Sequence, residues 1–176
     1  MRDVARLMRK EQRNKQSVAP MNTTTRILIV DDEEVVRLSF MRILASAHCK
    51  VKAVWSWAQV SEAMQNEKFD IVLLDLRLPG VDGMSILRSL KERWPESEVI
   101  IITGYPTLET AKEAVTLGAY DYLAKPVGPE QVIEAANAAM LHKRWALRND
   151  AGRSCQTSQE PSSPEVPAGF PTNPNL

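Results

Sequence analysis

The chain has 176 residues, 44% of them hydrophobic and 25% charged, which is the ordinary composition of a soluble globular protein with one domain. Its 22 basic and 22 acidic residues balance, which argues against sequence-independent binding to nucleic acid by the chain as a whole. No apolar run is long enough to span a membrane, the N-terminus lacks a signal-peptide core, and Cys49 and Cys155 show neither disulfide nor zinc-site spacing, so we expect a cytoplasmic protein without membrane insertion.

Charge and composition divide the chain into three segments. Residues 1–24 carry six basic residues against two acidic ones, and we expect a basic, disordered extension because so few apolar residues cannot offset the cost of ordering. An amphipathic membrane anchor is the less favoured alternative for this segment, and Met21 is an alternative start of the protein. Residues 150–176 hold five prolines and four serines, a composition typical of a disordered tail. Residues 25–149 remain as the folded domain.

Strand and helix patterns alternate along this domain. An apolar run at 27–30 stops at an acidic pair and predicts a strand buried on both faces. From Glu33 the apolar residues recur at helical spacing as far as Leu44. The predicted elements that follow are a weaker strand at 50–54, a helix that Ser56 caps and that ends near Lys68, a strand at 71–74, a loop at 79–83, a helix that stops before Pro95, a strand at 99–103, a helix from Thr107 to Gly118, a strand at 121–124 and a helix from Pro129 to about 147.

Five strand–helix repeats with short, buried strands predict an α/β fold in which a parallel sheet is covered by helices on both faces. At about 125 residues the repeats are too few for a closed barrel, which needs eight units. The sequence therefore predicts a doubly wound, five-stranded open sheet.

Polar residues with complementary chemistry follow four of these strands. Asp31 and Asp32, Asp75, Thr103 and Lys125 stand at strand ends, and the carboxyl ends of parallel strands meet at one edge of the sheet. Carboxylates packed together raise each other's pKa unless a cation joins them, and oxygen ligands favour Mg²⁺ over Zn²⁺. A metal, an ammonium and a hydroxyl facing a carboxylate suit phosphoryl transfer onto that carboxylate. Each residue alone has a structural explanation, such as a turn-forming Asp or a solvated Lys, but their joint placement on one edge favours a functional site.

Four motifs follow one another at these strand ends: Ile29-Val30-Asp31-Asp32-Glu33, Leu73-Leu74-Asp75-Leu76-Arg77-Leu78-Pro79-Gly80-Val81-Asp82-Gly83, Ile102-Thr103-Gly104 and Tyr122-Leu123-Ala124-Lys125-Pro126. Over about residues 25–148 they resemble the receiver domain of bacterial response regulators, and the likeness is greatest to receivers of the nitrogen-regulation type and of sensor-kinase hybrids. The resemblance implies a flavodoxin-like fold with strand order 2-1-3-4-5.

The resemblance implies a role for each motif residue. Asp75 would accept the phosphoryl group, Lys125 would pair with a phosphoryl oxygen, and Thr103 would bind another. Tyr122 would be the aromatic switch residue that is buried when Thr103 moves, although an aromatic on a strand is often there only for packing. A cis peptide is implied between Lys125 and Pro126. The Mg²⁺ ligands would be Asp31, Asp32, Asp75 and the backbone carbonyl of Arg77.

The resemblance also implies the partners. A sensor histidine kinase or a histidine phosphotransfer protein would donate the phosphoryl group, and a downstream protein would recognise the phosphorylated form. Phosphorylation-dependent homodimer formation stays open. Because no helix-turn-helix follows residue 149, we expect a stand-alone receiver that does not bind nucleic acid.

Such a protein is a phosphoacceptor in signalling rather than an enzyme, with only self-phosphorylation and autodephosphorylation activity. The alternative is an interaction module that is not phosphorylated, which the complete set of polar residues disfavours. A hydrolase with an Asp nucleophile is rejected, because Asp75-Leu76-Arg77 lacks a second acid two residues on.

Overall fold

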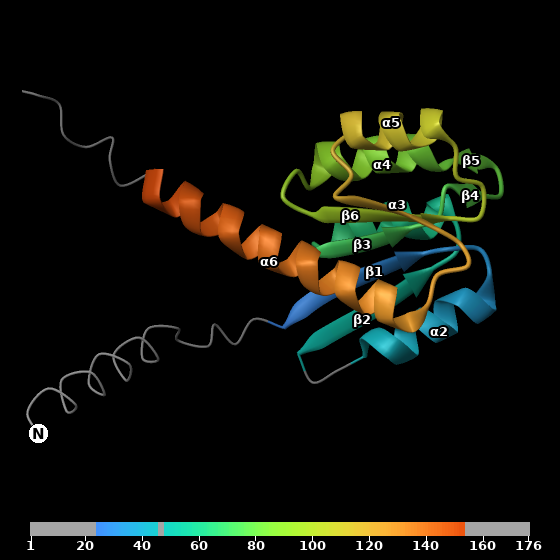
Figure 1. Ribbon diagram of the computed structural model, residues 1–176, viewed down its shortest axis with the longest axis horizontal. Coiled ribbons are helices and arrows are strands. Elements are labelled where there is room, and N and C mark those ends of the chain that lie inside the picture. Colours follow the sequence, from blue (N-terminus) through green and yellow to red (C-terminus); the bar gives the residue numbers. More distant parts are fainter. Residues whose placement is uncertain (1–23, 46–47, 154–176) are drawn as a thin grey trace, which may run out of the picture. The chain divides into compact units, whose positions relative to one another are not determined.

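The computed structural model describes residues 24–45 and 48–153, and a five-stranded parallel sheet lies at its centre (Figure 1). The strand order is β2-β1-β3-β6-β7, which equals the predicted order 2-1-3-4-5 when two short strands outside the sheet are left out of the count. This confirms the predicted fold class. The strands are β1 (Thr25–Val30), β2 (Cys49–Val54), β3 (Ile71–Leu74), β6 (Glu98–Thr103) and β7 (Asp121–Ala124).

Helices cover both faces of this sheet. Within the described residues, α3, α4 and α5 bury side chains against one face, and α2 and α6 against the other (Figure 1). Strand β1 serves both layers because successive side chains alternate: Leu28 and Val30 face the first, Ile27 and Ile29 the second. The helices are α2 (Glu34–Leu44), α3 (Trp57–Asn66), α4 (Gly83–Arg93), α5 (Leu108–Thr116) and α6 (Pro129–Arg153).

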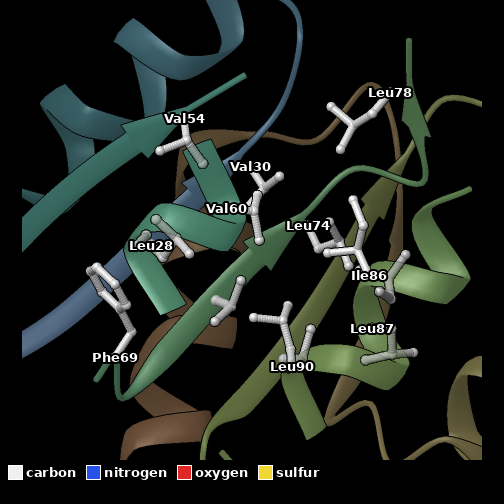
Figure 2. Packing of buried hydrophobic residues seen from close by; sticks show 14 of the residues in the cluster. Leu28, Val30, Val54, Val60, Phe69, Leu74, Leu78, Ile86, Leu87 and Leu90 are labelled. Atoms are coloured by element: carbon white, nitrogen blue, oxygen red, sulfur yellow. The ribbon is translucent and has the colours of Figure 1, made fainter. Parts of the chain in front are cut away.

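The central strands carry the core. Every residue of β3 and β6 is buried, and Figure 2 shows side chains of β1 and β3 meeting Val60 of α3 and Leu90 of α4. Complete burial of a Leu or Ile side chain contributes roughly 1.5–3 kcal/mol. The carboxyl ends of these strands, where the polar residues stand, are thus held by tightly packed elements.

Local polar contacts begin and end the helices as predicted. Ser56 accepts a hydrogen bond from the backbone N–H of Gln59 (3.5 Å) at the start of α3. Thr107 and Thr110 cap α5 reciprocally, each side chain accepting from the other residue's N–H, at 3.1 and 3.2 Å. Gly118, with φ of 85°, lies just beyond α5 in the left-handed conformation that favours glycine.

The predicted loop at 79–83 is more regular than expected. Strands β4 (Arg77–Leu78) and β5 (Val81–Asp82) form a small antiparallel hairpin there. Two residues per strand are too few to show an alternating pattern, so the hairpin could not be predicted from periodicity. The Asp82 side chain then caps α4 by accepting from the N–H of Met84 (3.3 Å). The backbone of Gly83 packs closely against Leu76, just before the hairpin. A Cβ atom on residue 83 would lie 2.7 Å from the carbonyl oxygen of Leu76.

The last helix is longer than predicted and ends at Arg153. Contacts divide the chain into two compact units, residues 1–143 and 144–176, and the described part of the second is the end of α6. The expected disordered segments, 1–24 and 150–176, lie almost entirely outside the described residues, so the three-part division of the chain stays a prediction.

Two polar contacts hold α6 at the amino ends of the central strands. Lys143 Nζ lies 2.7 Å from Asp70 Oδ1, just before β3. His142 Nδ1 lies 2.7 Å from Glu98 Oε1, at the start of β6. Both contacts are at the edge of the sheet opposite the strand ends that carry the site residues.

Candidate functional site

The backbone ladder of the sheet continues one residue beyond the strands and brings the predicted polar residues together. The N–H of Asp75 donates to the carbonyl of Val30 (2.8 Å), and the N–H of Lys125 donates to the carbonyl of Thr103 (2.8 Å). Residues after β3 and β7 are therefore fixed by their neighbouring strands. This is the convergence at one edge that the alternation of strands and helices predicted.

Three carboxylates form the centre of the site. Oxygens of Asp31, Asp32 and Asp75 lie within 4.8 Å of one another, with Asp31 and Asp75 buried and Asp32 exposed. One oxygen of each buried carboxylate is held by its own loop: Asp31 Oδ1 accepts from the N–H of Glu33 (2.9 Å), and Asp75 Oδ1 from the N–H of Arg77 (3.0 Å). The orientation of both carboxylates is thus set by backbone amides.

Lys125 joins the other oxygens of these carboxylates. Its Nζ lies 2.8 Å from Asp31 Oδ2, 2.7 Å from Asp75 Oδ2 and 3.1 Å from Glu33 Oε1. Burial lowers the pKa of Lys125, but its hydrogen bonds to the three carboxylates outweigh burial and raise that pKa above the ordinary value. The amine is therefore positively charged at neutral pH. The peptide bond from Lys125 to Pro126 is cis, as the family resemblance implied.

The pKa of Asp31, the acid beside Lys125, responds differently to its surroundings. Desolvation raises the pKa of Asp31, and the hydrogen bonds from Lys125 and from the N–H of Glu33 counter it only in part. The negative charge of Asp75 adds to the increase. The pocket therefore carries more negative charge than its one ammonium group neutralises, which favours the binding of a further cation.

The donor set fits a hard divalent cation. The clustered ligands are carboxylate oxygens, the type that Mg²⁺ prefers, and neither a thiol nor an imidazole belongs to this group of three acids. Arg77 also lies at the site, since its N–H contacts Asp75. The participation of its carbonyl stays a prediction.

Thr103 lies beside this cluster rather than bonded to it. Its side chain is fully buried, and its hydroxyl accepts a hydrogen bond from the N–H of Tyr105 (3.3 Å). The guanidinium of Arg77 stacks on the exposed ring of Tyr105, 4.3 Å from the ring centre. These three residues contribute to the lining of an open cavity of about 540 Å³, together with Leu76, which directly follows Asp75.

Tyr122 is half-buried on β7 and packs against the core on the α3–α5 side of the sheet. Its hydroxyl lies 2.8 Å from the hydroxyl of Thr110, one of the two residues of the α5 capping box. The ring is thus tied to the first turn of α5.

Comparison with known proteins decides the family. Residues 27–137 match the family model described as the response regulator receiver domain. The chain belongs to this family. It is therefore a receiver domain of the kind found in two-component response regulators, as its motifs indicated.

The curated proteins that this receiver resembles include transcriptional regulators. It is 33% identical over 131 residues to the C4-dicarboxylate transport transcriptional regulatory protein DctD of Pseudomonas aeruginosa, covering 74% of this chain and 28% of that protein. It is 34% identical over 116 residues to the DNA-binding transcriptional regulator NtrC of Escherichia coli, covering 66% and 25%. The chain thus spans about a quarter of the length of these curated relatives.

Solved structures share the fold. A CheY-like receiver domain protein of Methanospirillum hungatei has a TM-score of 0.68 at 28% identity, covering 70% of this chain and 99% of that one. NtrX of Brucella abortus, in complex with ADP, also has a TM-score of 0.68 at 28% identity, covering 73% and 30%. A response regulator of Burkholderia pseudomallei, solved with a phosphorylated aspartic acid, a calcium ion and citrate, has a TM-score of 0.60 at 31% identity, covering 71% and 75%.

Two residues at the receiver's site were not singled out from the sequence. Glu33 directly precedes α2, where its carboxylate contacts Lys125 and gives the helix no side-chain cap. Arg37 turns back from α2 onto the loop that holds Asp31 and Asp32. The acidic run at 31–34 could have drawn attention to Glu33, whereas Arg37 looks like any other helical Arg.

None of the helices in the described ranges, 24–45 and 48–153, has the length and hydropathy needed to cross a membrane.

Proposed function

We propose that this receiver accepts a phosphoryl group on Asp75 from the phosphohistidine of a sensor kinase or phosphotransfer protein, in a Mg²⁺-dependent reaction. The observation that carries the proposal is the setting of Asp75: a buried carboxylate 2.7 Å from the Lys125 amine and clustered with two further acids. The Burkholderia pseudomallei relative with a phosphorylated aspartic acid supports the same chemistry.

In this reaction an oxygen of Asp75 forms a bond to phosphorus while the bond between phosphorus and the donor's imidazole nitrogen breaks. The imidazole keeps the electron pair of the broken bond and takes up a proton. The N–H of Arg77 holds one oxygen of the nucleophile in place. Lys125 holds the other and carries positive charge where the phosphoryl oxygens would arrive.

The metal would be held by Asp31, Asp32 and Asp75, with the carbonyl of Arg77 as a further ligand. When bound, Mg²⁺ supplies charge that the phosphoryl oxygens and the crowded carboxylates both need. Support comes from the three clustered oxygens and from the raised pKa of Asp31, which reflects a buried acid without sufficient neutralising charge.

The signal would pass through Thr103 and Tyr122. A phosphoryl group on Asp75 adds up to two negative charges and new hydrogen-bond acceptors. The Thr103 hydroxyl would leave the N–H of Tyr105 to bind one of them, and Tyr122 would leave Thr110 to occupy the vacated space. Because Thr110 caps α5, this movement would change the surface of α5 and β7 that a partner protein meets.

The remaining expectations concern cellular context. We propose a cytoplasmic protein whose partners are the phosphodonor and a downstream protein, with a phosphorylation-dependent homodimer as a further proposal. Binding to nucleic acid is not part of the proposal, although the NtrC relative is a DNA-binding regulator, because that protein is about four times as long as the matched region. Catalysis would be limited to the receiver's own phosphorylation and dephosphorylation.

The test is incubation of the full chain with acetyl phosphate and Mg²⁺, followed by intact mass measurement. We expect the gain of one phosphoryl group, lost in Asp75→Asn and in the absence of metal. Asp121→Asn is the matched control, because it removes a carboxylate at the start of β7, away from the site, and it should still gain the group. No gain by the folded, unaltered chain would favour an interaction module that is not phosphorylated.

A further inference from the structure

Arg37 makes an unusual set of contacts for a residue in the first turns of a helix. Its Nη1 donates to two successive backbone carbonyls, those of Asp31 (2.9 Å) and Asp32 (2.8 Å). The side chain therefore reaches back over the start of α2 and closes the loop between β1 and α2. The two carbonyls belong to two of the three clustered acids.

The two acids depend on this contact to different degrees. Asp31 is buried and is also fixed by its N–H bond to the Val54 carbonyl (3.2 Å) and by its carboxylate contacts. Asp32 is exposed, and among the described residues the bond from Arg37 to its carbonyl is the one side-chain contact that anchors it. Loss of Arg37 would thus release Asp32 first.

Trp55 fixes the guanidinium from the other side. The guanidinium carbon of Arg37 lies over the Trp55 ring, 5.2 Å from its centre, and Trp55 is about half exposed. Trp55 directly follows β2, the strand next to β1, and its N–H donates to Gln59 Oε1 (3.0 Å). The planar guanidinium can lie over the ring while one of its nitrogens donates to both carbonyls, a combination that the compact, strongly hydrated ammonium of Lys on its shorter reach reproduces less well.

Charge and geometry make opposite predictions for this residue. A cation beside the acidic cluster repels a divalent metal ion, so by charge alone its removal would strengthen metal binding. By geometry, removal frees the loop and moves the Asp32 carboxylate away from its two partners, which weakens binding. The sign of the change separates the two.

We propose that Arg37 is a positioning residue for the divalent cation, and that Trp55 holds it in place. The inference rests on the proposed function, since it assumes that the acidic cluster binds Mg²⁺. Arg37 does not itself contact the metal. It keeps residues 31–33 in the conformation that brings the carboxylate of Asp32 to those of Asp31 and Asp75.

Titration calorimetry of the full chain with Mg²⁺ tests this without any phosphorylation step. We expect the dissociation constant of Arg37→Ala to rise about tenfold, as for other residues that orient metal ligands. Trp55→Leu should raise it about threefold, in line with the loss of one stacked pair. Arg42→Ala is the matched control: it removes the same charge from an exposed position on the same helix and should leave the constant within about twofold.

Equal or tighter Mg²⁺ binding by folded Arg37→Ala would overturn the inference while leaving the metal site intact. Absence of binding by the unaltered chain would overturn the metal site and the inference together. If circular dichroism shows that Arg37→Ala does not fold, Arg37→Lys decides: it keeps the charge but lacks the flat group, so about threefold weaker binding supports the inference and unchanged binding overturns it.

Discussion

Lys125→Met isolates the part that one ammonium group plays in the stability of the carboxylate pocket. Met keeps most of the aliphatic stem and removes the charge. In the unaltered chain the side chains of Asp31 and Asp75 are 3% and 4% exposed and share the Lys125 amine at 2.8 and 2.7 Å. The substitution therefore leaves two buried carboxylates without the ammonium group that they share.

Removing one partner of a buried ion pair costs about 3–5 kcal/mol. Because small domains are stable by only about 5–15 kcal/mol, the loss should be large and easily measured. We expect a decrease of about 3–5 kcal/mol in the free energy of unfolding, from urea titrations at pH 7.5 in EDTA followed by circular dichroism. Lys112→Met, on an exposed face of α5, is the control and should change stability by less than about 0.5 kcal/mol.

The pH dependence provides an internal check. Lys125 lowers the pKa of Asp31 against the effect of burial, so its removal raises that pKa further. A carboxyl whose pKa is raised in the folded state binds protons more tightly there, and the folded state gains stability as pH falls. The cost of Lys125→Met should thus shrink between pH 7.5 and 5.5. A cost below about 1 kcal/mol at pH 7.5, or one that grows on acidification, would refute this reasoning.

Three further outcomes are expected. Arg77 and Tyr105 stack at the edge of the site, where their bulk would hinder the approach of a hydrolytic water to a phosphoryl group on Asp75, so the double change Arg77→Asn with Tyr105→Ala should shorten the phosphoryl lifetime measured by intact mass. Gly83→Ala should lower the free energy of unfolding by roughly 1–3 kcal/mol, because its Cβ would overlap the backbone of the preceding loop. The salt bridge to Lys52 lowers the pKa of Glu67 below its ordinary value, so this pair stabilises the fold at neutral pH and ceases to do so as the pH falls through that lowered pKa; Glu67→Gln should cost less than about 1 kcal/mol at pH 7, and the cost should shrink on acidification.

Each of these has an outcome that contradicts it. Equal phosphoryl lifetimes in the two proteins would remove any effect of the stacked pair on hydrolysis. Unchanged urea midpoints for Gly83→Ala would mean that the loop moves at little cost. A Glu67→Gln effect that does not shrink on acidification would point to packing rather than charge.

The alternation of strands and helices could be predicted from the sequence alone because each element buries a face with its own period. The strand at 71–74 is apolar throughout because both of its faces are covered, whereas α2 shows helical spacing because only one side is buried. Ser56, Thr107 and Gly118 marked helix ends through short-range backbone chemistry, which does not depend on the rest of the fold.

The convergence of Asp31, Asp75, Thr103 and Lys125 at one edge also followed from the sequence, because parallel strands end at the same edge wherever they lie along the chain. The sequence did not indicate which of these side chains contact one another. The amine of Lys125 bonds both buried acids, while the Thr103 hydroxyl bonds a backbone N–H instead. Such choices depend on side-chain rotamers and on distances between loops, which no local pattern encodes.

The sequence by itself determined the fold class, the edge at which the site forms and the residues whose chemistry suits phosphoryl transfer. Only the tertiary structure decided that Glu33 shares the Lys125 amine, that Arg37 closes the acidic loop against Trp55, and that Arg77 stacks on Tyr105. The physical reason is that hydrophobic period and backbone capping are local in the chain. Contacts of charged groups join loops that come together only after the sheet has formed.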